Sequence, residues 1–264
     1  MWMCVKWEGQ RQLRLPRFWG SLAALFVLGL LFTYGYAQLR GQPVLAALLG
    51  HGLTDGFFVP ILAISVSASM MLPFFISLIT GDAISGERQW GTWATLLTQG
   101  VPPWRLYTSK WIVGLAYAAL ATLVLAGTSL AGGVAMFGWH ATVLPSGLLA
   151  STGTLALLLA VACLYAMAGQ MVVASLALAV SAYCRHTVSA IMVTMGVLIF
   201  MVLLGNLPFL RSVNPFLFTT YFSRIADVLS SPPNWALMGQ GLLVYGAYTA
   251  LSWAIVFWAP PFRG

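Results

Sequence analysis

The feature that most constrains this chain is a series of six long apolar runs. Each run has about the 20 residues that a helix needs to cross the hydrocarbon core of a bilayer. Lipid offers the backbone no hydrogen bonds, so only helices and closed barrels cross it, and barrel strands would alternate apolar and polar residues. The runs do not alternate, so they predict an all-α polytopic membrane protein with six transmembrane helices. These helices are expected at Phe18–Ala37, Phe57–Ile79, Trp111–Phe137, Leu155–Tyr183, Val188–Leu207 and Trp235–Trp258.

The composition excludes an ordinary soluble domain. Hydrophobic residues make up 60% of the 264 residues and charged residues only 6%, against about 25% charged residues in typical soluble domains. The three cysteines, Cys4, Cys163 and Cys184, are scattered without a CxxC pair, so they predict neither a disulfide framework nor a metal site. The three histidines fall on different predicted loops, which also argues against a metal or haem site.

The basic residues predict the orientation, because cytoplasmic loops of membrane proteins carry an excess of lysine and arginine. With the N-terminus inside, nine of the twelve basic residues face the cytoplasm and three lie outside, so both termini are expected to be cytoplasmic. This distribution accounts for the net charge of +7 without a nucleic-acid partner. The nine are Lys6, Arg11, Arg14, Arg17, Arg88, Arg105, Lys110, Arg185 and Arg263, and the three are Arg40, Arg211 and Arg224.

Residues 1–264 are expected to form a single transmembrane domain in the lipid bilayer. Residues 1–17 would be a cytoplasmic amphipathic entry segment, and residues 81–110 a cytoplasmic loop between the second and third helices. Residues 208–234 would be an extracytoplasmic loop with a short helix in the outer leaflet. Residues 145–183 are too long for one span, so a short interfacial helix is expected ahead of the fourth transmembrane helix.

The stretch ISGERQWGTWATLLTQG stands out because it carries charge between two apolar runs. Asp82 is expected to cap a helix here, and no proline interrupts the chain before Leu97. Trp90, Trp93, Ala94 and Leu97 recur at helical spacing and therefore share one face. Tryptophans on such a face suit the membrane–water boundary. The pattern leaves two interpretations open: an interfacial anchor for the loop, or a docking element whose polar face meets a soluble partner.

The run GDAISGERQWGTWATLLTQG, followed by Lys110, resembles the membrane subunits of type-2 ABC transporter permeases. In that family the segment after the second span reads Gly-Glu, Gly-Thr, a Leu-Leu pair, a Pro-x-x-Arg turn and a Lys. The turn departs from this pattern, since its proline and arginine are displaced to Pro102 and Arg105. The N-terminal VKWEGQRQLRLPRFW also looks like the family's basic amphipathic entry helix, with Lys6 and Glu8 in the region where the family usually has a Lys-Glu pair. The matching loop residues are Gly86, Glu87, Gly91, Thr92, Leu96, Leu97 and Lys110.

The resemblance implies a transport subunit, not an enzyme, that forms the export path and dimerises with itself or with a second permease. A separate ATP-binding cassette subunit would bind ATP and Mg, and this chain, which lacks a G-x-x-x-x-G-K-[ST] loop, would bind no cofactor. The location implied is the cytoplasmic (cell) membrane of a bacterium or archaeon. The expected partner-coupling residues are Glu87, Arg88, Gly91, Thr92, Leu96, Leu97, Arg105 and Lys110, with Trp90 and Trp93 as interfacial anchors.

Two polar residues are expected at mid-depth in the membrane, Gln170 and the weaker Thr194. Hydrogen bonding between helices is the simpler explanation for both. The alternative is that they line the translocation path, with Gln170 at a dimer seam. Two other functions stay open: a membrane scaffold or assembly factor without transport, and an ion-coupled secondary carrier. A copurifying ATPase would separate an ABC transporter subunit from a carrier.

Overall fold

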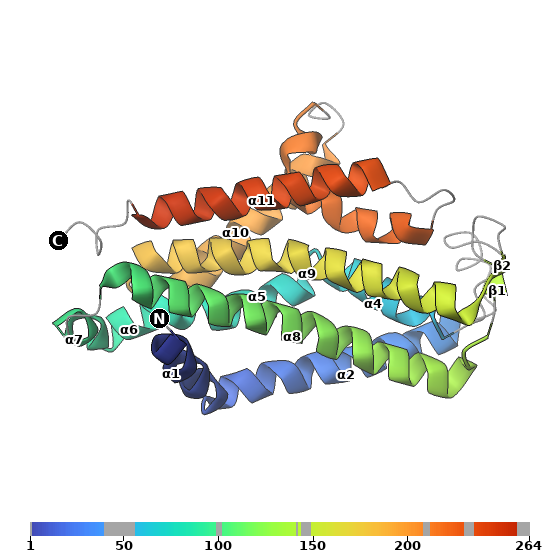
Figure 1. Cartoon of the computed structure of the whole chain (residues 1–264), viewed down its shortest axis with the longest axis horizontal. Helices are drawn as coiled ribbons and strands as arrows, with labels where there is room; N and C mark the ends of the chain where they lie inside the picture. The colour runs from blue at the N-terminus through green and yellow to red at the C-terminus, as the bar shows by residue number, and fades with distance from the viewer. Residues whose placement is uncertain are drawn as a thin grey trace.

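The computed structural model describes residues 2–39, 56–98, 102–140, 142–143, 149–207, 212–229 and 235–257. This part of the chain forms a helical bundle, in which α2, α8, α9 and α11 follow the long axis of the molecule (Figure 1). The second apolar run is divided between two shorter helices, α4 and α5. The long helices are α2 (Pro16–Leu39), α8 (Pro103–Phe137), α9 (Thr152–Tyr183), α10 (Thr187–Asn206) and α11 (Trp235–Phe257), and the shorter pair is α4 (Phe58–Ser67) and α5 (Met71–Thr80).

Shorter elements lie at the ends of the bundle and between the long helices. Two-residue strands β1 and β2 pair antiparallel, with Thr142 opposite Ala150. The short helices are α1 (Trp2–Leu13), α6 (Asp82–Gln89) and α7 (Thr92–Thr98), the 3-10 helices are η2 (Asn214–Phe216) and η3 (Phe218–Leu229), and the strands are β1 (Thr142–Val143) and β2 (Leu149–Ala150).

The predicted membrane-crossing character is confirmed for most of the bundle. Among the described residues four helices, α2, α8, α9 and α10, are long and apolar enough to cross a membrane, and α4 with α5 makes a fifth span if the pair is counted as one. Helix α11 has 23 residues. It contains Gln240, Tyr245 and Tyr248, and it is not among the helices that are both long enough and apolar enough to cross a membrane. The sixth transmembrane helix therefore stays a prediction.

The second span is not the straight helix predicted at Phe57–Ile79, because α4 and α5 are bent by 60° relative to each other. Pro73 explains the break. It has no amide to donate to the carbonyl of Ser69, and its ring would clash with that carbonyl in a continuous helix. Gln170 of α9 supports the broken segment by donating from Nε2 to the carbonyl oxygen of Ala68 at 3.0 Å.

Small residues allow α2 and α8 to approach closely. A Cβ atom on Gly132 would lie 2.6 Å from Oγ1 of Thr33, so only a glycine fits without a shift. Thr33 also donates to the carbonyl of Ser129 across the same contact, at 3.4 Å. Helices in lipid associate through close packing of this kind and through hydrogen bonds, because lipid tails are as apolar as the side chains.

One end of the bundle gathers α1, α6, α7 and the first turns of α8 (Figure 1). Eight of the nine basic residues predicted to face the cytoplasm belong to this end, and the ninth, Arg263, lies outside the described residues. Arg40 and Arg211, predicted to lie outside, are also beyond the described part. A single basic end is the arrangement that the positive-inside pattern requires.

The start of the fourth span corrects the sequence prediction. In place of a short interfacial helix, the described residues before it form the β1–β2 pair, and α9 begins at Thr152. Ser151 caps this helix by accepting a hydrogen bond from the amide of Thr154 at 3.3 Å. Helix α9 then absorbs the long apolar run in 32 continuous residues.

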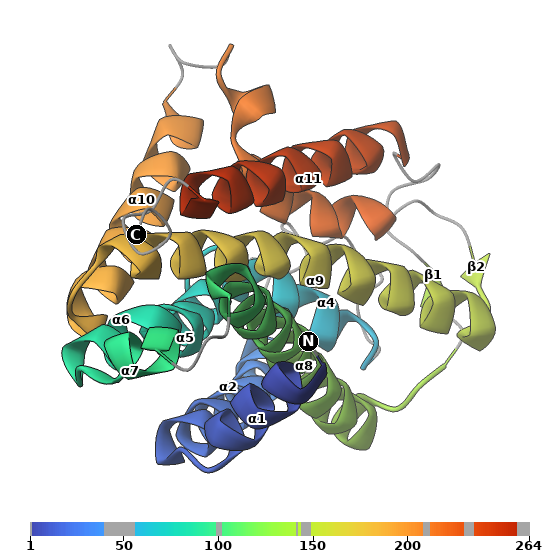
Figure 2. The ribbon, with the colours of Figure 1, turned by 60° about the vertical axis from the view of Figure 1, so that its left-hand side comes forward.

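The predicted helix within residues 208–234 is present as η3, whose apolar side is buried in the bundle. Phe218, Phe222 and Ile225 are fully or almost fully buried, while residues 208–211 and 230–234 lie outside the described part. Figure 2 shows α10 running at a steep angle to α9, so that other helices do not cover much of α10. Most of its exposed side chains are apolar, Met192 and Phe200 among them, as expected for a surface against lipid or another apolar surface.

Candidate functional site

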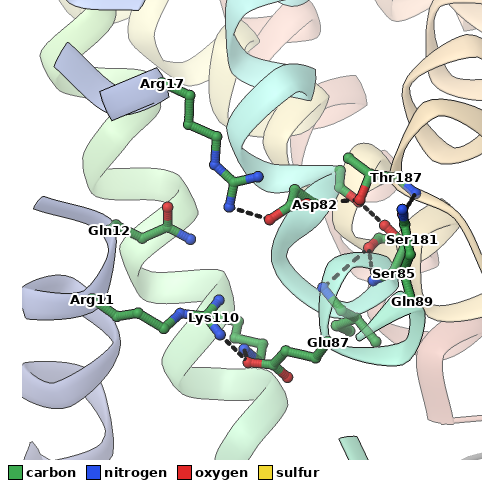
Figure 3. Close-up of polar contacts among 12 residues, drawn as sticks. Arg11, Gln12, Arg17, Asp82, Ser85, Glu87, Gln89, Lys110, Ser181 and Thr187 are labelled. Atoms are coloured by element: carbon green, nitrogen blue, oxygen red, sulfur yellow. Dashed lines mark hydrogen bonds and ion pairs between the residues drawn. The ribbon is translucent and has the colours of Figure 1, made fainter. Parts of the chain in front are cut away.

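A group of four charged side chains, here called the ionic cluster, joins three elements at the basic end, and three of its members, Arg11, Glu87 and Lys110, are labelled in Figure 3. Lys110 Nζ of α8 lies 2.5 Å from Glu87 Oε1 of α6 and 3.1 Å from Glu8 Oε2 of α1. Arg11 of α1 pairs with Glu8 at 2.9 Å and also with Glu87. The side chains of Lys110, Glu8 and Glu87 are at most 3% exposed. Two positive and two negative groups therefore balance inside the protein.

The balance matters because a buried charge is tolerated only with a partner. Removing one member of a buried pair typically costs about 3–5 kcal/mol, since the remaining charge is left without compensation. Gln12 adds a hydrogen bond from Nε2 to Glu8 Oε1 at 3.4 Å. The ionic cluster thus fixes α6 to α1 and α8 as one unit.

Helix α1 turns its polar side toward the bundle. Glu8 and Gln12 are buried, while Trp2, Met3 and Trp7 are exposed. This is the reverse of a soluble amphipathic helix, and it suits a helix whose outer face meets the membrane boundary, where tryptophan is favoured. The orientation explains why Glu8 of the ionic cluster is buried.

Helix α6 is also held by the ends of three other helices. Asp82 pairs with Arg17 at the start of α2 and accepts a hydrogen bond from Thr187 Oγ1 at 2.7 Å. Ser181 Oγ of α9 accepts from the amide of Ser85 at 2.9 Å. The predicted capping role of Asp82 is wrong, since Gly81 occupies the cap position and no side chain caps this helix. Asp82 instead links α6 to α2 and α10.

The single helix predicted from Asp82 to Leu97 is interrupted at Gly91. This residue has a φ of 71°, a left-handed conformation that glycine adopts at little cost. The turn changes the helical register, so Trp90 and Trp93 do not share a face. Trp90 is 80% exposed, whereas Trp93 is 7% exposed and packs in a small apolar core with Ile84. Predicting one shared tryptophan face was therefore wrong.

The other predicted coupling residues are placed in different surroundings. Thr92 Oγ1 donates to the carbonyl of Glu87 at 3.2 Å, across the Gly91 turn. The guanidinium of Arg105 lies 5.3 Å from the ring of Trp104 in an exposed cation–π contact. Leu96 is partly buried on α7, and the side chain of Leu97 lies outside the described part.

Arg88 is the cationic group of α6 that no ion pair joins within the described chain. Its pKa is lowered from the ordinary value chiefly by partial burial and further by nearby Arg185, while Cys184 acts in the opposite direction. The family resemblance implied that Glu87 and Arg88 both contact a partner. The structure separates them, because Glu87 is buried in the ionic cluster and Arg88 is partly exposed.

A cavity of about 540 Å³ opens beside the ionic cluster. Arg11 and Arg17 line one side of it, and Asp82, Glu87 and the exposed Trp90 line the other. The Oε2 atom of Glu87 is buried without a hydrogen-bond partner among the described residues. The cavity thus brings charged groups of both signs next to an aromatic ring at the surface.

Gln170 and Thr194, predicted at mid-depth, are both fully buried within the single chain. Thr194 Oγ1 donates to the carbonyl of Ala190 in its own helix at 2.8 Å. Gln170 donates to Ala68 of the broken second span, as the simpler explanation by interhelical hydrogen bonding requires. Within the described chain neither side chain reaches the surface, where a dimer seam would have to lie.

The sequence predictions missed Arg11 and Ser181 as partners of α6, and they missed Glu8 as the carboxylate that pairs with Lys110. One signal was present: the chain has only five acidic residues, and a scarce acid in an apolar protein needs a cation close by. That rule indicates pairing but not which cation pairs with which acid. The long-range contacts that decide this depend on the packed fold.

The comparison with known families agrees with this geometry. A model of the family described as ABC-2 family transporter protein matches residues 2–252, nearly the whole chain. No curated protein matches the chain. The family provides membrane components of ABC transporters, which pair in general with an ATP-binding cassette subunit. The match includes α1, the broken second span and the ionic cluster, and the chain belongs to the ABC-2 transporter family.

Proposed function

We propose that this chain forms the translocation path of an ABC exporter in the cytoplasmic membrane and that α6 and α7 bind a separate ATP-binding subunit. Two copies, or one copy with a second permease, would enclose the path. ATP and Mg would be bound by the partner subunit. The basic end of the bundle is the cytoplasmic end in this proposal, in keeping with the positive-inside pattern.

The observation that carries the proposal is the ionic cluster. A partner that displaced α6 would also move α1 and α8, because Glu87 is tied to both through Arg11 and Lys110. Asp82 extends the connection to α2 and α10 through Arg17 and Thr187. A rigid connection of this kind can pass a movement at the surface to several membrane helices together.

The surface offered to the partner differs from the sequence prediction. Glu87 is buried, so the residues that a second protein could contact include Arg88 of α6, which no ion pair joins among the described residues, and the exposed Trp90 just after α6. Aromatic residues and arginine are favoured at the centres of protein interfaces. The expected partner surface is acidic, with an apolar recess for the Trp90 ring.

The test is copurification of the ATP-binding subunit with tagged variants of the full-length chain. Trp90→Ser and Arg88→Glu should each reduce the bound ATPase at least tenfold while the melting temperature stays unchanged. The matched control is Trp2→Ser, because Trp2 is also 80% exposed but lies on α1. Retention of a normal amount of ATPase by both α6 variants would contradict the proposed docking surface.

A labelling experiment tests the orientation independently. Gln89 is exposed at the end of α6, so a Gln89→Cys variant with the three native cysteines replaced carries one reactive thiol there. An impermeant maleimide should label it in inverted vesicles and not in intact cells. The reverse pattern would place α6 outside the cell, where it could not meet an ATPase.

Charge reversal at Glu87 is a poor test of coupling. The substitution would put three positive groups around one carboxylate in a buried site, so it should unfold the protein before it affects transport. Surface variants of α6 separate partner binding from folding more cleanly.

A further inference from the structure

A second polar site lies far from the ionic cluster, where the broken second span meets the end of α10 and the 3-10 helix η3. It is a cavity of about 290 Å³, here called the hydroxyl pocket. Val202 and Gly205 complete its wall. Its polar lining residues are Ser69, Asn206, Thr219, Thr220 and Ser223.

The break in the second span creates one side of the hydroxyl pocket. Ser69 lies between α4 and α5. In a continuous helix the carbonyl of Ser69 would accept a hydrogen bond from the amide of residue 73, but Pro73 has no amide hydrogen to donate. The neighbouring carbonyl of Ala68 receives the amide of Gln170 at 3.0 Å. Gln170 is thus a positioning residue that satisfies one freed carbonyl and leaves the next residue, Ser69, at the wall of the pocket.

The other side of the hydroxyl pocket holds buried hydroxyls without partners. Thr219 is 7% exposed, and its Oγ1 atom has no hydrogen-bond partner among the described residues. Thr220 is partly buried, and its Oγ1 atom is likewise buried without a partner among the described residues. By contrast, the buried Thr122 donates to the carbonyl of Ala118 in its own helix at 2.9 Å. A buried hydroxyl that is left unpaired costs stability, so two of them in one cavity call for an explanation.

The chemistry of the lining restricts what could pair with these hydroxyls. A phosphate or carboxylate is normally bound by arginine or lysine, and a metal cation by carboxylates. No charged side chain lines the hydroxyl pocket in the described structure. Arg224, on the same 3-10 helix, is engaged with Asp227 at 3.3 Å. Hydroxyls that both donate and accept match an uncharged group of the same kind.

We propose that the hydroxyl pocket binds an uncharged polyol group, such as a sugar, carried by the transported substrate. The inference rests on the proposed transport function, since it names the class of substrate. The polyol could belong to a free solute or to the headgroup of a glycolipid, and the chemistry of recognition is the same for both.

The test is thermal unfolding of the full-length protein in phosphatidylcholine nanodiscs with two probes. One arm titrates methyl glucoside as the free solute. The other adds monoglucosyl diacylglycerol to the disc, with plain diacylglycerol as its reference. A ligand that binds only the folded state raises the melting temperature in a saturable way, and one arm should show this.

Two variants connect the response to the hydroxyl pocket. Thr219→Val with Thr220→Val removes the unpaired hydroxyls at nearly constant volume and should abolish the ligand-dependent rise. Gly205→Ala narrows the pocket, because its Cβ would lie 3.4 Å from Thr220 Oγ1, and should weaken the apparent affinity severalfold. Thr122→Val is the matched control and should respond like the wild type.

A wild-type protein that responds to neither probe, or a double valine variant that responds fully, would overturn the proposal. Copurification of the ATPase is measured on the same variants. If the ATPase still binds when the polyol response is missing, the substrate class is wrong and the transport proposal stands. If the response is present without an ATPase, the hydroxyl pocket stands and the coupling proposal fails.

Discussion

The ionic cluster and the hydroxyl pocket are both buried polar sites in an apolar protein, yet they handle polarity in opposite ways. In the ionic cluster every charged group has an opposite charge within hydrogen-bonding range. In the hydroxyl pocket Thr219 and Thr220 hold buried hydroxyls that no described residue satisfies. The charges of the first site balance within the chain, although Glu87 Oε2 and Arg11 Nε have no hydrogen-bond partner among the described residues, whereas the second site has no described group that pairs with its two hydroxyls.

The difference teaches what each site is suited to do. Opposite charges that pair across several helices rigidify the elements they join, which suits the transmission of movement. Unpaired groups in a cavity lower the stability of the empty protein. A ligand that supplies the missing hydrogen bonds raises that stability again. Substitutions in the ionic cluster should therefore destabilise the protein. Substitutions in the hydroxyl pocket should leave the stability of the protein unchanged or raise it.

The largest expected effect is at Lys110. Lys110→Met leaves Glu8 and Glu87 with Arg11 alone, so the cluster gains a net negative charge and should lose about 3–5 kcal/mol of unfolding free energy. Thermal unfolding in detergent measures the loss. The control Lys6→Met alters an exposed lysine of α1 and should change stability by less than about 0.5 kcal/mol.

A second change makes this test sharper. Adding Glu87→Gln to the Lys110→Met variant removes the surplus negative charge and should restore part of the lost stability. If the double variant is no more stable than Lys110→Met alone, charge balance is not what holds the cluster together.

Asp82 should show the next largest effect. Asp82→Asn keeps the shape of the side chain but removes its charge from Arg17, and the loss expected for one charged hydrogen bond is about 2 kcal/mol. The control Asp227→Asn affects the more exposed pair with Arg224 and should cost about 0.5 kcal/mol. If both substitutions lowered the unfolding free energy equally, the burial of Asp82 would not strengthen its ion pair with Arg17.

Much of this contrast was beyond prediction from the sequence. The apolar runs predicted the spanning helices, and the spacing of basic residues predicted one basic end. The pairing of Glu87 with Arg11 and Lys110 was missed, because it joins residues 76 and 23 positions apart. Only the packed fold brings such distant positions together, whereas helical periodicity reports local structure.

Two local signals could have been used more fully. Pro73 follows a run with alternate serines, and a proline within an apolar span is a frequent cause of a break. Gly91 lies inside the supposed continuous helix, where glycine is also the residue most often found just past a helix end. In both places the apolar periodicity was given more weight than the residue that interrupts it.

The turn at Gly91 should give a smaller effect that does not involve charge. Gly91→Ala forces a side chain into the left-handed region, and the expected loss is about 1 kcal/mol from backbone strain alone. The surrounding space is open, so no clash contributes. The control Gly9→Ala lies within α1, also in open space, and should stabilise the protein by about 0.5 kcal/mol. If the two substitutions changed stability by similar amounts, the turn at residue 91 would have moved to a backbone conformation that alanine adopts without strain.

The smallest expected effect has the opposite sign and tests the comparison most directly. Thr219→Val removes a buried hydroxyl that has no partner, so the empty protein should be unchanged or more stable by up to about 1 kcal/mol. Thr122→Val removes a hydroxyl that is bonded, and should instead cost about 0.5 kcal/mol. Unfolding measured without added polyol gives both values. Destabilisation by Thr219→Val would mean that its hydroxyl is already satisfied in the empty protein, and the distinction between the two sites would then disappear.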